Sequence, residues 1–263
     1  MKEQKWYETS EDLLMPLPLT EEEARRSEGN LTEEAEDRRR FLSITLPNNT
    51  NITVLPIIPG ITRYGYIRFL NASPAEQRVD IYANGRRVAT DLLYREFTEY
   101  LKVLPGWYRI AVYAAGTTRY PLTVTTLQVR ANGITTLAVI GLANEIDVQR
   151  VEDTRRRWNR NRAYVRFVQL SPNAPVMDAY WDDALVVSDL EYREISRYLM
   201  TAAGKHNLKM RDSLSGANLV EHPNIRLAGG KAYTIYIVGD VADRTGLQVL
   251  IPLEGSTYLD FGE

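Results

Sequence analysis

The chain has 263 residues, of which 44% are hydrophobic, and this is enough to bury the cores of two domains. Its formal net charge of −2 argues against a general attraction to nucleic acid or to anionic lipid. The sequence contains 0 cysteines, which excludes disulfides, thiolate metal ligands and cysteine nucleophiles.

The N-terminal residues are charged and lack the apolar core of ~7 to 15 residues that a secretory signal needs. We therefore expect no classical export and a cytoplasmic location by default. No apolar run approaches the ~20 residues of a membrane-spanning helix, so we expect no membrane span.

Residues 1–63 differ from the rest and are predicted to form an arm. Residues 13–19 are apolar and broken by prolines, and short helices are predicted to begin at Thr20 and Thr32. Residues 46–60 contain prolines that cannot donate to a sheet, which predicts an extended connector. The arm is either a solvated, disordered extension or an anchor that docks on its own domains or on a partner.

The remaining sequence contains an internal repeat. Residues 66–74 return at residues 164–172, 98 positions later. Between Tyr66 and Gly106, 41 positions align without a gap with the second copy, and 16 are identical. Two unrelated β segments would not share so many residues, so the chain contains a duplication.

Each copy has the pattern of a β-sandwich. Apolar alternation and turn residues predict strands in the first copy at residues 64–70, 78–83, 86–91, 106–113, 122–129, 135–140 and 145–151. Asn84 and Gly85 predict a tight hairpin, since both tolerate a positive φ. Strands of this number and length are typical of two packed antiparallel sheets.

A family resemblance rests on the repeated motifs. An aromatic-x-Arg-Phe segment is followed by Ser-Pro, Val-Asp-x-Tyr-x-Asn-Gly, Asp-Leu-x-Tyr, Tyr-Leu and Leu-Pro-Gly-x-Tyr. This pattern resembles the domain of unknown function (DUF) 4397 family and extends from Tyr64 to the C-terminus. The second copy departs from it at Asp182 and Asp183 and at residues 203–206. The resemblance implies a β-sandwich, commonly in bacterial surface or envelope proteins, with no established activity.

The predicted fold is therefore all-β, with two tandem immunoglobulin-like or transthyretin-like antiparallel β-sandwiches after a partly helical N-terminal arm. We expect the arm at residues 1–63 and the first sandwich at residues 64–152. The second sandwich, with a basic linker at its start, is expected at residues 153–263.

One strand of the first copy carries aromatic residues on its second face. The pattern puts Tyr108, Ile110 and Val112 in the core, and Trp107, Arg109, Ala111 and Tyr113 on the opposite face. The second copy replaces that opposite set by Lys205, Asn207, Lys209 and Arg211. The aromatic face is either covered by protein or acts as a platform for a carbohydrate; the candidate stacking residues are Trp107, Tyr113, Tyr180 and Trp181.

Charged residues at repeated positions have structural interpretations. The recurring set is Arg68, Asp80, Asp91, Arg166, Asp178 and Asp189. Asp91 precedes a turn and is expected to accept backbone hydrogen bonds, while Arg68 is a candidate ion-pair partner for Asp80. A catalytic carboxylate pair is the less favoured alternative.

The sequence offers little support for a catalytic, metal or cofactor site. His206 and His222 are the only histidines and make a weak ligand set, so no metal site is expected. Phosphate loops, nucleophile elbows and dinucleotide fingerprints do not occur, which predicts a protein without cofactor and without enzymatic activity, an intracellular hydrolase being the weakest alternative.

Residues 154–162 place five arginines around Trp158. This patch is either a nucleic-acid contact or a solvated linker whose arginines pair with the acidic clusters at residues 21–23 and 33–37. The acidic composition favours the linker.

These observations predict a non-enzymatic structural or adhesive protein of a bacterial surface layer, either the cell envelope or a spore coat. Without an export signal the protein would reach the layer by a non-classical route, such as assembly on a spore from inside the mother cell. Self-association is expected through the arm, with Leu13, Leu14, Leu17 and Leu19, or residues 52–58, covering the surface near Trp107. The alternative is a carbohydrate- or other ligand-binding module.

Overall fold

The computed structural model describes residues 63–76, 78–142, 145–243, 246–259 and 261, and the backbone of two strands in the arm. These two strands, β1 (Leu42–Thr45) and β2 (Asn51–Val54), pair antiparallel, which the sequence did not predict. The predicted helices after Thr20 and Thr32 and the apolar residues 13–19 lie outside the described residues.

The remaining strands fall into two groups of eight in chain order. The first group is β3 (Gly65–Asn71), β4 (Arg78–Ala83), β5 (Arg86–Leu93), β6 (Leu101–Val103), β7 (Gly106–Ala114), β8 (Thr123–Val129), β9 (Ile134–Ile140) and β10 (Asp147–Glu152). The second is β11 (Arg162–Gln169), β12 (Met177–Trp181), β13 (Ala184–Leu190), β14 (Leu199–Ala202), β15 (Gly204–Asp212), β16 (Asn218–Leu227), β17 (Ala232–Gly239) and β18 (Leu247–Leu250). One short helical turn, η2 (Gly255–Thr257), follows β18.

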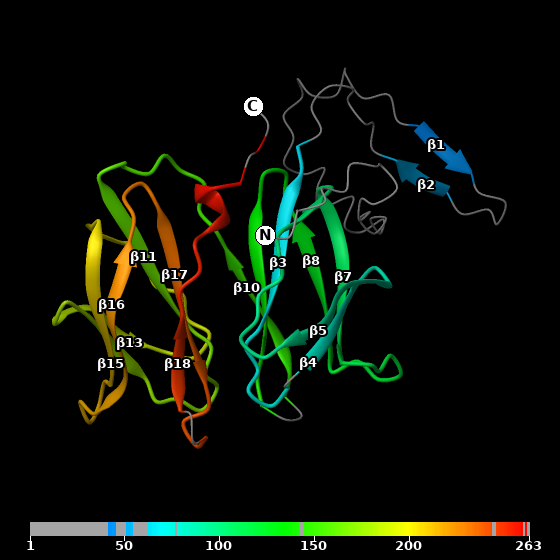
Figure 1. Cartoon of the computed structure of the whole chain (residues 1–263). Coiled ribbons are helices and arrows are strands. Elements are labelled where there is room, and N and C mark those ends of the chain that lie inside the picture. Colours follow the sequence, from blue (N-terminus) through cyan, green and yellow to red (C-terminus); the bar gives the residue numbers. More distant parts are fainter. Residues whose placement is uncertain are drawn as a thin grey trace, which may run out of the picture.

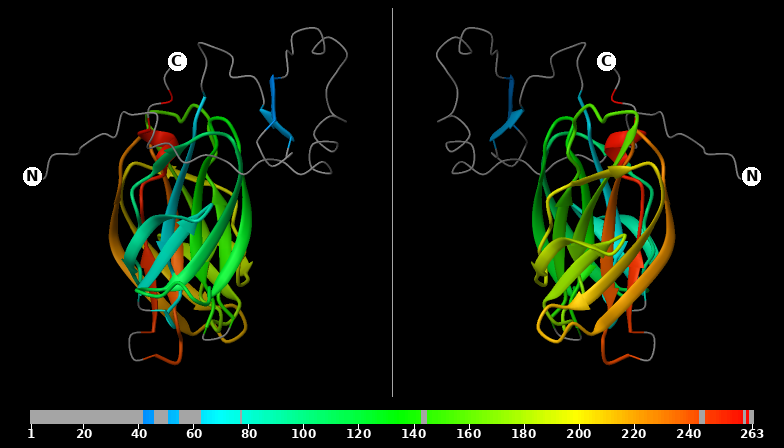
Figure 2. Two further views of the ribbon diagram at one scale, coloured as in Figure 1. Left: turned by 90° about the vertical axis from the view of Figure 1, so that its right-hand side faces the viewer. Right: turned by 90° about the vertical axis from the view of Figure 1, so that its left-hand side faces the viewer.

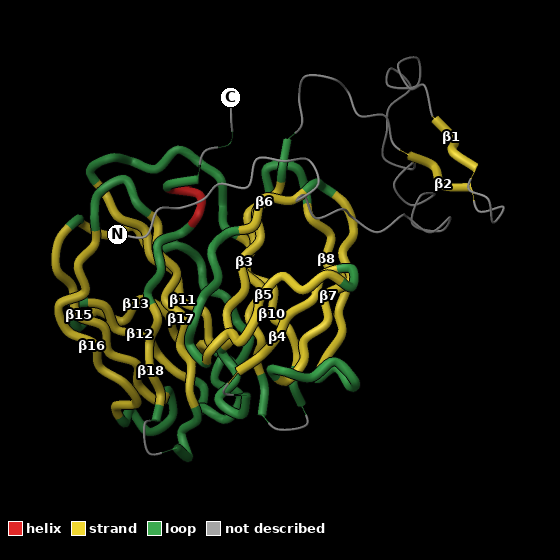
Figure 3. Tube along the Cα trace, turned by 45° about the vertical axis from the view of Figure 1, so that its right-hand side comes forward, coloured by secondary structure: helices red, strands yellow, loops and turns green. Residues whose placement is uncertain are grey.

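Each group forms two four-stranded sheets, so the all-β sandwich prediction is confirmed (Figure 3). The first domain has the orders β10-β9-β3-β6 and β5-β4-β7-β8, and the second repeats them as β14-β11-β17-β18 and β13-β12-β15-β16. One pair in each domain, β3 with β9 and β11 with β17, is parallel, whereas fully antiparallel sheets were predicted. These partners are far apart in sequence, so local pattern did not reveal their direction. The domain limits 64–152 and 153–263 stay a prediction.

The two sandwiches stand side by side as four layers (Figure 1). The sheets containing β3 and β11 face each other in the middle, and the sheets containing β7 and β15 lie outside. The strands of both domains lie along roughly the same axis, with neighbours mostly pointing in opposite directions (Figure 2). Strands β3 and β9 are therefore buried on both faces, which explains why they read as nearly continuous apolar runs.

The first core confirms the predicted alternation. Tyr108, Ile110 and Val112 of β7 are all 0% exposed and pack with Ile67 and Phe69 of β3. Alternate strand residues point to opposite faces, so this spacing of apolar side chains sets which face of β7 is turned to the core.

The second core repeats the first. His206, Leu208 and Met210 occupy the positions of that β7 set on β15, and all three are buried.

The hairpins show how the two copies keep one geometry with different residues. Asn84 and Gly85 have φ of 51° and 80°, which confirms the predicted turn between β4 and β5. Asp182 and Asp183 adopt φ of 48° and 65° between β12 and β13. In both turns the first side chain accepts a hydrogen bond from β7 or β15, at 2.8 Å each, so the turn survives its departure from the family pattern.

We predict that Asp183→Gly stabilises the protein, because a residue with a Cβ is strained at φ 65° and glycine is not. The expected gain in the free energy of unfolding is about 1 kcal/mol, reduced by loss of the exposed Asp183–Lys209 ion pair. Urea denaturation of the full chain measures it.

Gly85→Ala is the matched control. A Cβ there meets no atom within 4 Å, so its loss of stability reports the backbone cost alone. Equal stability of Asp183→Gly and the natural protein would contradict the prediction.

Candidate functional site

The two inner sheets meet through an apolar layer. Leu70, Ala138 and Ile140 of the first domain pack against Val168 and Tyr236 of the second, and all five are 0% exposed. The domains are therefore joined by a continuous hydrophobic contact that resembles a domain core.

A charged cluster interrupts this apolar layer. The Nη2 atom of Arg166 lies 3.0 Å from Asp153 Oδ1, and its Nε atom lies 3.0 Å from Glu254 Oε1. The arginine side chain is 5% exposed and both carboxylates are 0% exposed. Arg166 also donates to Thr234 Oγ1 at 2.9 Å and to the Glu152 carbonyl at 2.7 Å, so its donors are well used.

The equivalent arginine of the first domain is bound differently. Arg68 donates from Nε to Thr136 Oγ1 at 2.9 Å, as Arg166 does to Thr234. Its guanidinium lies 4.7 Å from the ring centres of both Phe97 and Tyr100. Its buried Nη2 atom has no hydrogen-bond partner among the described residues. One buried arginine thus has two carboxylates, and its counterpart has aromatic rings.

The carboxylates come from the segments that follow the last strand of each domain. Asp153 donates its backbone N–H to Ile134 O at 2.9 Å, and Glu254 does so to the equivalent Ala232 O at 3.0 Å. Asp153 belongs to the linker, yet it bonds Arg166 of the second domain. The tail after Glu254 returns to the first domain, where the Gly255 N–H donates to Asp153 Oδ2 at 2.9 Å. Linker and tail therefore each cross between the domains.

Two tyrosines complete the cluster. The Tyr100 hydroxyl donates to Asp153 Oδ2 at 3.1 Å, and the Tyr198 hydroxyl donates to Glu254 Oε1 at 2.9 Å. Burial is the largest cause of the raised pKa of both phenols. Asp153 raises the pKa of Tyr100 further, and Glu254 raises that of Tyr198 against the opposing effect of Arg166, so both remain neutral donors. Burial and the neighbouring Glu254 carboxylate raise the pKa of Asp153 to about 6, against the opposing effect of Arg166.

The repeated Asp-Leu-x-Tyr-Arg-Glu motif makes a second contact between domains. Arg95 hydrogen-bonds Gln248 of β18, and its equivalent Arg193 hydrogen-bonds Gln149 of β10 at 3.0 Å. Arg193 also pairs with Asp147 at 2.9 Å.

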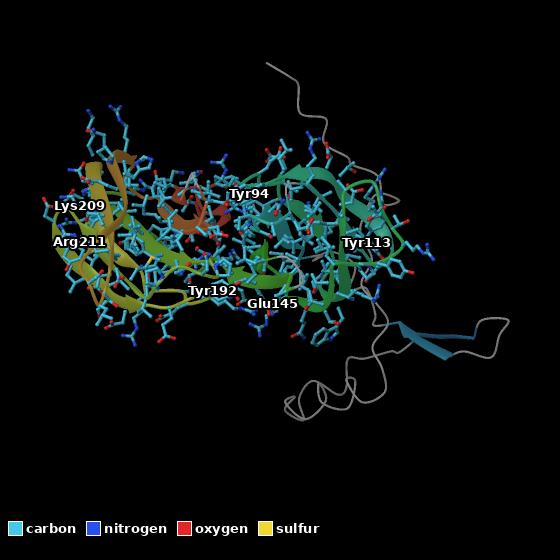
Figure 4. All side chains as sticks on the ribbon, turned by 90° about the horizontal axis from the view of Figure 1, so that it is seen from below. Tyr94, Tyr113, Glu145, Tyr192, Lys209 and Arg211 are labelled. Carbon is cyan, nitrogen blue, oxygen red and sulfur yellow. The ribbon has the colours of Figure 1, made fainter. Side chains whose placement is uncertain are left out.

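The tyrosine of this motif lies at the same boundary in both copies. Seen from below, Tyr94 and Tyr192 lie at the middle of the molecule, and Tyr192 is beside Glu145 (Figure 4). Burial is the largest cause of the raised pKa of Tyr192. Asp147 and Glu145, across the interface, raise this pKa further, and Arg193 opposes them. The motif therefore joins the domains, a role that local sequence did not predict.

The repeated carboxylates of Asp80 and Asp178 hold a backbone irregularity on the neighbouring strand. Asp80 Oδ1 accepts the Asp91 N–H at 2.8 Å, and Asp178 Oδ1 accepts the Asp189 N–H at 3.0 Å. Asp91 on β5 and Asp189 on β13 have φ of 54° and 53°, so these bonds hold the same left-handed residue within a strand of each copy. Asp91 was expected to accept backbone hydrogen bonds, but its Oδ2 atom instead accepts from Arg78 at 2.6 Å.

The predicted pairing of Arg68 with Asp80 is wrong. Arg68 lies on β3 in an inner sheet and Asp80 lies on β4 in an outer sheet. The cation nearest to Asp80 is Arg87 on the neighbouring strand β5, at 3.9 Å. Strand alternation does not tell which of two sheets a residue belongs to, and this caused the error.

The proposed stacking residues do not share one surface. Trp107 and Tyr113 are half-buried on the outer face of the first domain, where Tyr113 contacts Tyr82 edge-on at 5.3 Å. Tyr180 is half-buried on the outer face of the second domain, beneath Arg211 at 4.8 Å.

Trp181 was wrongly assigned as a platform residue. It is 4% exposed, contacts Phe167 at 6.3 Å and stacks on His206 at 5.2 Å, so it belongs to the second core. Strand alternation turns it away from Tyr180 and toward the interior.

His206 is part of that core and of the adjacent turn. Its Nδ1 atom lies 2.6 Å from Asp182 Oδ2, and its Nε2 atom lies 2.9 Å from the Ala202 carbonyl. Hydrogen bonds from His206 and from the Asn207 N–H lower the pKa of Asp182, although desolvation opposes them. Within the described part of the chain, no group of three His, Asp or Glu residues is placed to hold a metal ion.

The basic linker docks on the second domain. The guanidinium of Arg156 lies 4.2 Å from the ring centre of Trp158, 4.9 Å from that of Tyr164 and 5.5 Å from that of Tyr198. Cation–π contacts of this kind stabilise the crossing segment. The two hypotheses drawn from the sequence, a nucleic-acid contact and pairing with the acidic clusters of the arm, did not include this contact.

The sequence model described as "Domain of unknown function (DUF4397)" matches residues 65–180 and again residues 163–256. The chain belongs to the DUF4397 family. The two overlapping matches agree with two tandem copies, and the predicted resemblance is thereby confirmed.

Other comparisons identify no role for this DUF4397 protein. No curated protein matches it. The family 26 carbohydrate-binding module of Eubacterium rectale Amy13K, solved with maltoheptaose, has 10% identity and a TM-score of 0.24, covering 73% of this chain and 99% of that one. The Bacillus anthracis TIE protein has 9% identity and a TM-score of 0.22, covering 77% of this chain and 41% of that one. At these scores the likenesses assign no ligand to this chain.

Sequence reasoning missed most of the cluster between the domains. It singled out Arg68 and Arg166 as repeated residues, but Asp153 and Glu254 were not recognised as their partners. The other missed pair, Thr136 and Thr234, recurs at the same 98-residue spacing, and that spacing was the available signal. No helix of the described residues has the length and apolar character needed to cross a membrane.

We predict that Arg166→Met and Arg68→Met differ in their effect on stability. Arg166→Met leaves two buried carboxylates without their cation and should lower the free energy of unfolding by about 3 to 5 kcal/mol. Arg68→Met removes one hydrogen bond and the contacts with two rings, and should cost about 1 to 2 kcal/mol.

Urea denaturation of both variants in parallel measures this difference. The positions are equivalent in the two copies, so each serves as control for the other. Equal losses would show that Asp153 and Glu254 do not depend on Arg166.

We further predict that Asp153 makes the protein less stable as pH rises from about 4 to 6. Its pKa is 3.8 when unperturbed and about 6 in the folded chain, so in this window the folded form keeps a proton that the unfolded form has lost. The loss should approach about 3 kcal/mol at ~1.4 kcal/mol per pKa unit.

Asp153→Asn should flatten this part of the pH dependence. Other carboxyl groups titrate in the same range, so the informative quantity is the difference between the natural protein and the variant at pH 4, 5, 6 and 7. Parallel curves for the two proteins would refute the assignment.

Proposed function

We propose that the protein is a non-catalytic structural and adhesive component of a bacterial surface layer, in the cell envelope or the spore coat. The main support is the buried cluster of Arg166, Asp153 and Glu254, which joins two sandwiches into one four-layer block. Such a block resists separation of its domains, because parting them would expose charged and apolar groups together. This resistance suits a protein that bears load in a layer.

The ionisable groups of the cluster support a non-catalytic role. The carboxylates of Asp153 and Glu254 are fully buried and bonded to residues of the same cluster. A general acid or base must reach a substrate within hydrogen-bond distance. These two side chains instead use their oxygens in holding the domains together.

The outer sheets supply the surfaces for adhesion. Figure 4 places Tyr113 at the outer side of the first domain, and Lys209 and Arg211 at the outer side of the second. The first surface is partly aromatic and the second is charged, with Lys209 2.6 Å from Asp183. The block therefore presents two chemically different faces to its neighbours.

A carbohydrate-binding module is the alternative. The observation that favours it is the outer face of the first domain, where Trp107, Tyr82 and Tyr113 are half-buried and leave aromatic surface open to solvent. Aromatic rings of this kind stack on sugar faces.

A glycan array and cell fractionation separate the two proposals. For a structural component we expect no glycan binding above background, and recovery of the native protein in the envelope or coat fraction. Array binding that Trp107→Ala or Tyr113→Ala abolishes would favour the binding module and overturn the structural proposal. Gln128→Ala, next to Trp107 on β8, is the matched surface control.

Self-association through the arm belongs to the same proposal. Residues 13–19 lie outside the described residues, and nothing is described of the side chains at positions 52–54. Light scattering and thermal melting of the chain without residues 1–45 test it. An unchanged mass together with an unchanged melting temperature would remove the arm from the proposal.

A further inference from the structure

A hollow of about 320 Å³ opens at the end of the first sandwich, between the turn that joins β8 to β9, the end of β10 and the start of the linker. Three arginines line it: Arg130, Arg150 and Arg155. A neighbouring hollow of about 430 Å³ shares Arg130 and Arg150. The cationic side chains thus gather around open space, on a protein whose overall charge is −2.

Only one carboxylate in these walls is available to the arginines. Glu152 pairs with Arg150. Asp153 also lines the hollow, but its Oδ1 atom is bonded to Arg166 and its Oδ2 atom to Tyr100. Three arginines therefore line the hollow with only one carboxylate, that of Glu152, outside the cluster between the domains.

Two of the arginines remain without an anion. Arg155 lies over the ring of Phe261 at 4.0 Å, and for Arg130 and Arg155 the described residues provide no carboxylate partner. The Nε atom of Arg150 is buried and has no hydrogen-bond partner there either. The site consequently has unused donors and an excess of positive charge.

The second domain shows that the fold does not require these arginines. Ala228 stands at the position of Arg130, and Ile251 at that of Arg150. Ser256 follows Glu254 by two residues, as Arg155 follows Asp153. In that copy the linker runs close to the equivalent turn, because a Cβ on Gly229 would lie 2.4 Å from the Arg160 carbonyl. The three arginines around this hollow are therefore specific to the first domain.

We propose that Arg130, Arg150 and Arg155 form an oxyanion-binding site that takes the phosphate or carboxylate group of a small ligand. The planar guanidinium group donates two parallel hydrogen bonds to such an anion. An anion placed between these arginines would neutralise their mutual repulsion and use the idle donors. The site stands independently of the proposed role in a surface layer, since none of its lining residues belongs to a strand of an outer sheet.

Titration of the full, ¹⁵N-labelled chain with inorganic phosphate, and separately with glucuronate, tests the site by NMR. We expect saturable shifts of the backbone amides of Asn132, Gly133, Arg150 and Glu152 with at least one probe. The probe that saturates identifies the preferred anionic group. The double variant Arg130→Ala/Arg155→Ala should bind about tenfold more weakly or not at all, a loss of ~1.4 kcal/mol or more.

Arg109→Ala is the control, because Arg109 is exposed on the outer face of the same domain. It should leave both titrations unchanged. Both substituted arginines are exposed, so the variant should keep the natural spectrum elsewhere, and Arg130→Gln/Arg155→Gln provides a second version if it does not. Shifts that fail to saturate with either probe, or equal affinity in the natural protein and the double variant, would overturn the proposal.

Discussion

Two carboxylates with no exposed surface, Asp153 and Glu254, share one guanidinium, Arg166, where the two domains meet. Charges removed from water are costly unless their partners and hydrogen bonds are all in place, so this contact exists only while both domains, the linker and the tail are correctly assembled. Most of the architecture follows from that condition. The inner sheets must face each other, and the segments after β10 and β18 must cross between the domains.

The apolar layer and the charged cluster contribute different properties to this interface. Packing of Leu70, Ile140 and Val168 buries apolar surface, which lowers the free energy of the assembled domains but does not specify their relative orientation. Hydrogen bonds of the Arg166 cluster and the paired contacts of Arg95 and Arg193 with Gln248 and Gln149 fix the orientation of the domains. The family motif Asp-Leu-x-Tyr-Arg-Glu belongs to this second group, so its recurrence in both copies reflects contact between domains as well as turn geometry.

The sequence predicted what depends on near neighbours. The strands, the hairpin at Asn84 and Gly85, and the core face of β7 were found because alternation and turn chemistry operate over a few residues. The duplication was found because a shift of 98 positions aligns the motifs. Partners of Arg68 and Arg166 were not found, since Thr136 and Thr234 lie 68 residues away from them and strand patterns do not reveal which sheets face each other. Trp181 was assigned to the wrong face because the identity of a single aromatic residue does not show whether it lies on the buried or the exposed face of a strand.

The outer face of the first domain and the arginine-lined hollow show a different limit. Both are differences between two copies that otherwise share one geometry, and such differences are visible only when the copies are compared position by position. Trp107 against Lys205 and Arg130 against Ala228 are examples. The residues that the copies share maintain the block, whereas the residues that they do not share distinguish its surfaces.

The unequal environments of Arg68 and Arg166 have a consequence for how such a block can change over time. In a symmetric pair of identical subunits, one residue must fit both sides of the contact at once. Here the two copies differ at one equivalent position of the buried layer between them. The first domain has the small residue Ala138, and the second has the large residue Tyr236. Because the two copies are parts of one chain, their contact surfaces need not be identical. A substitution in one domain can therefore be compensated by a different substitution in the other.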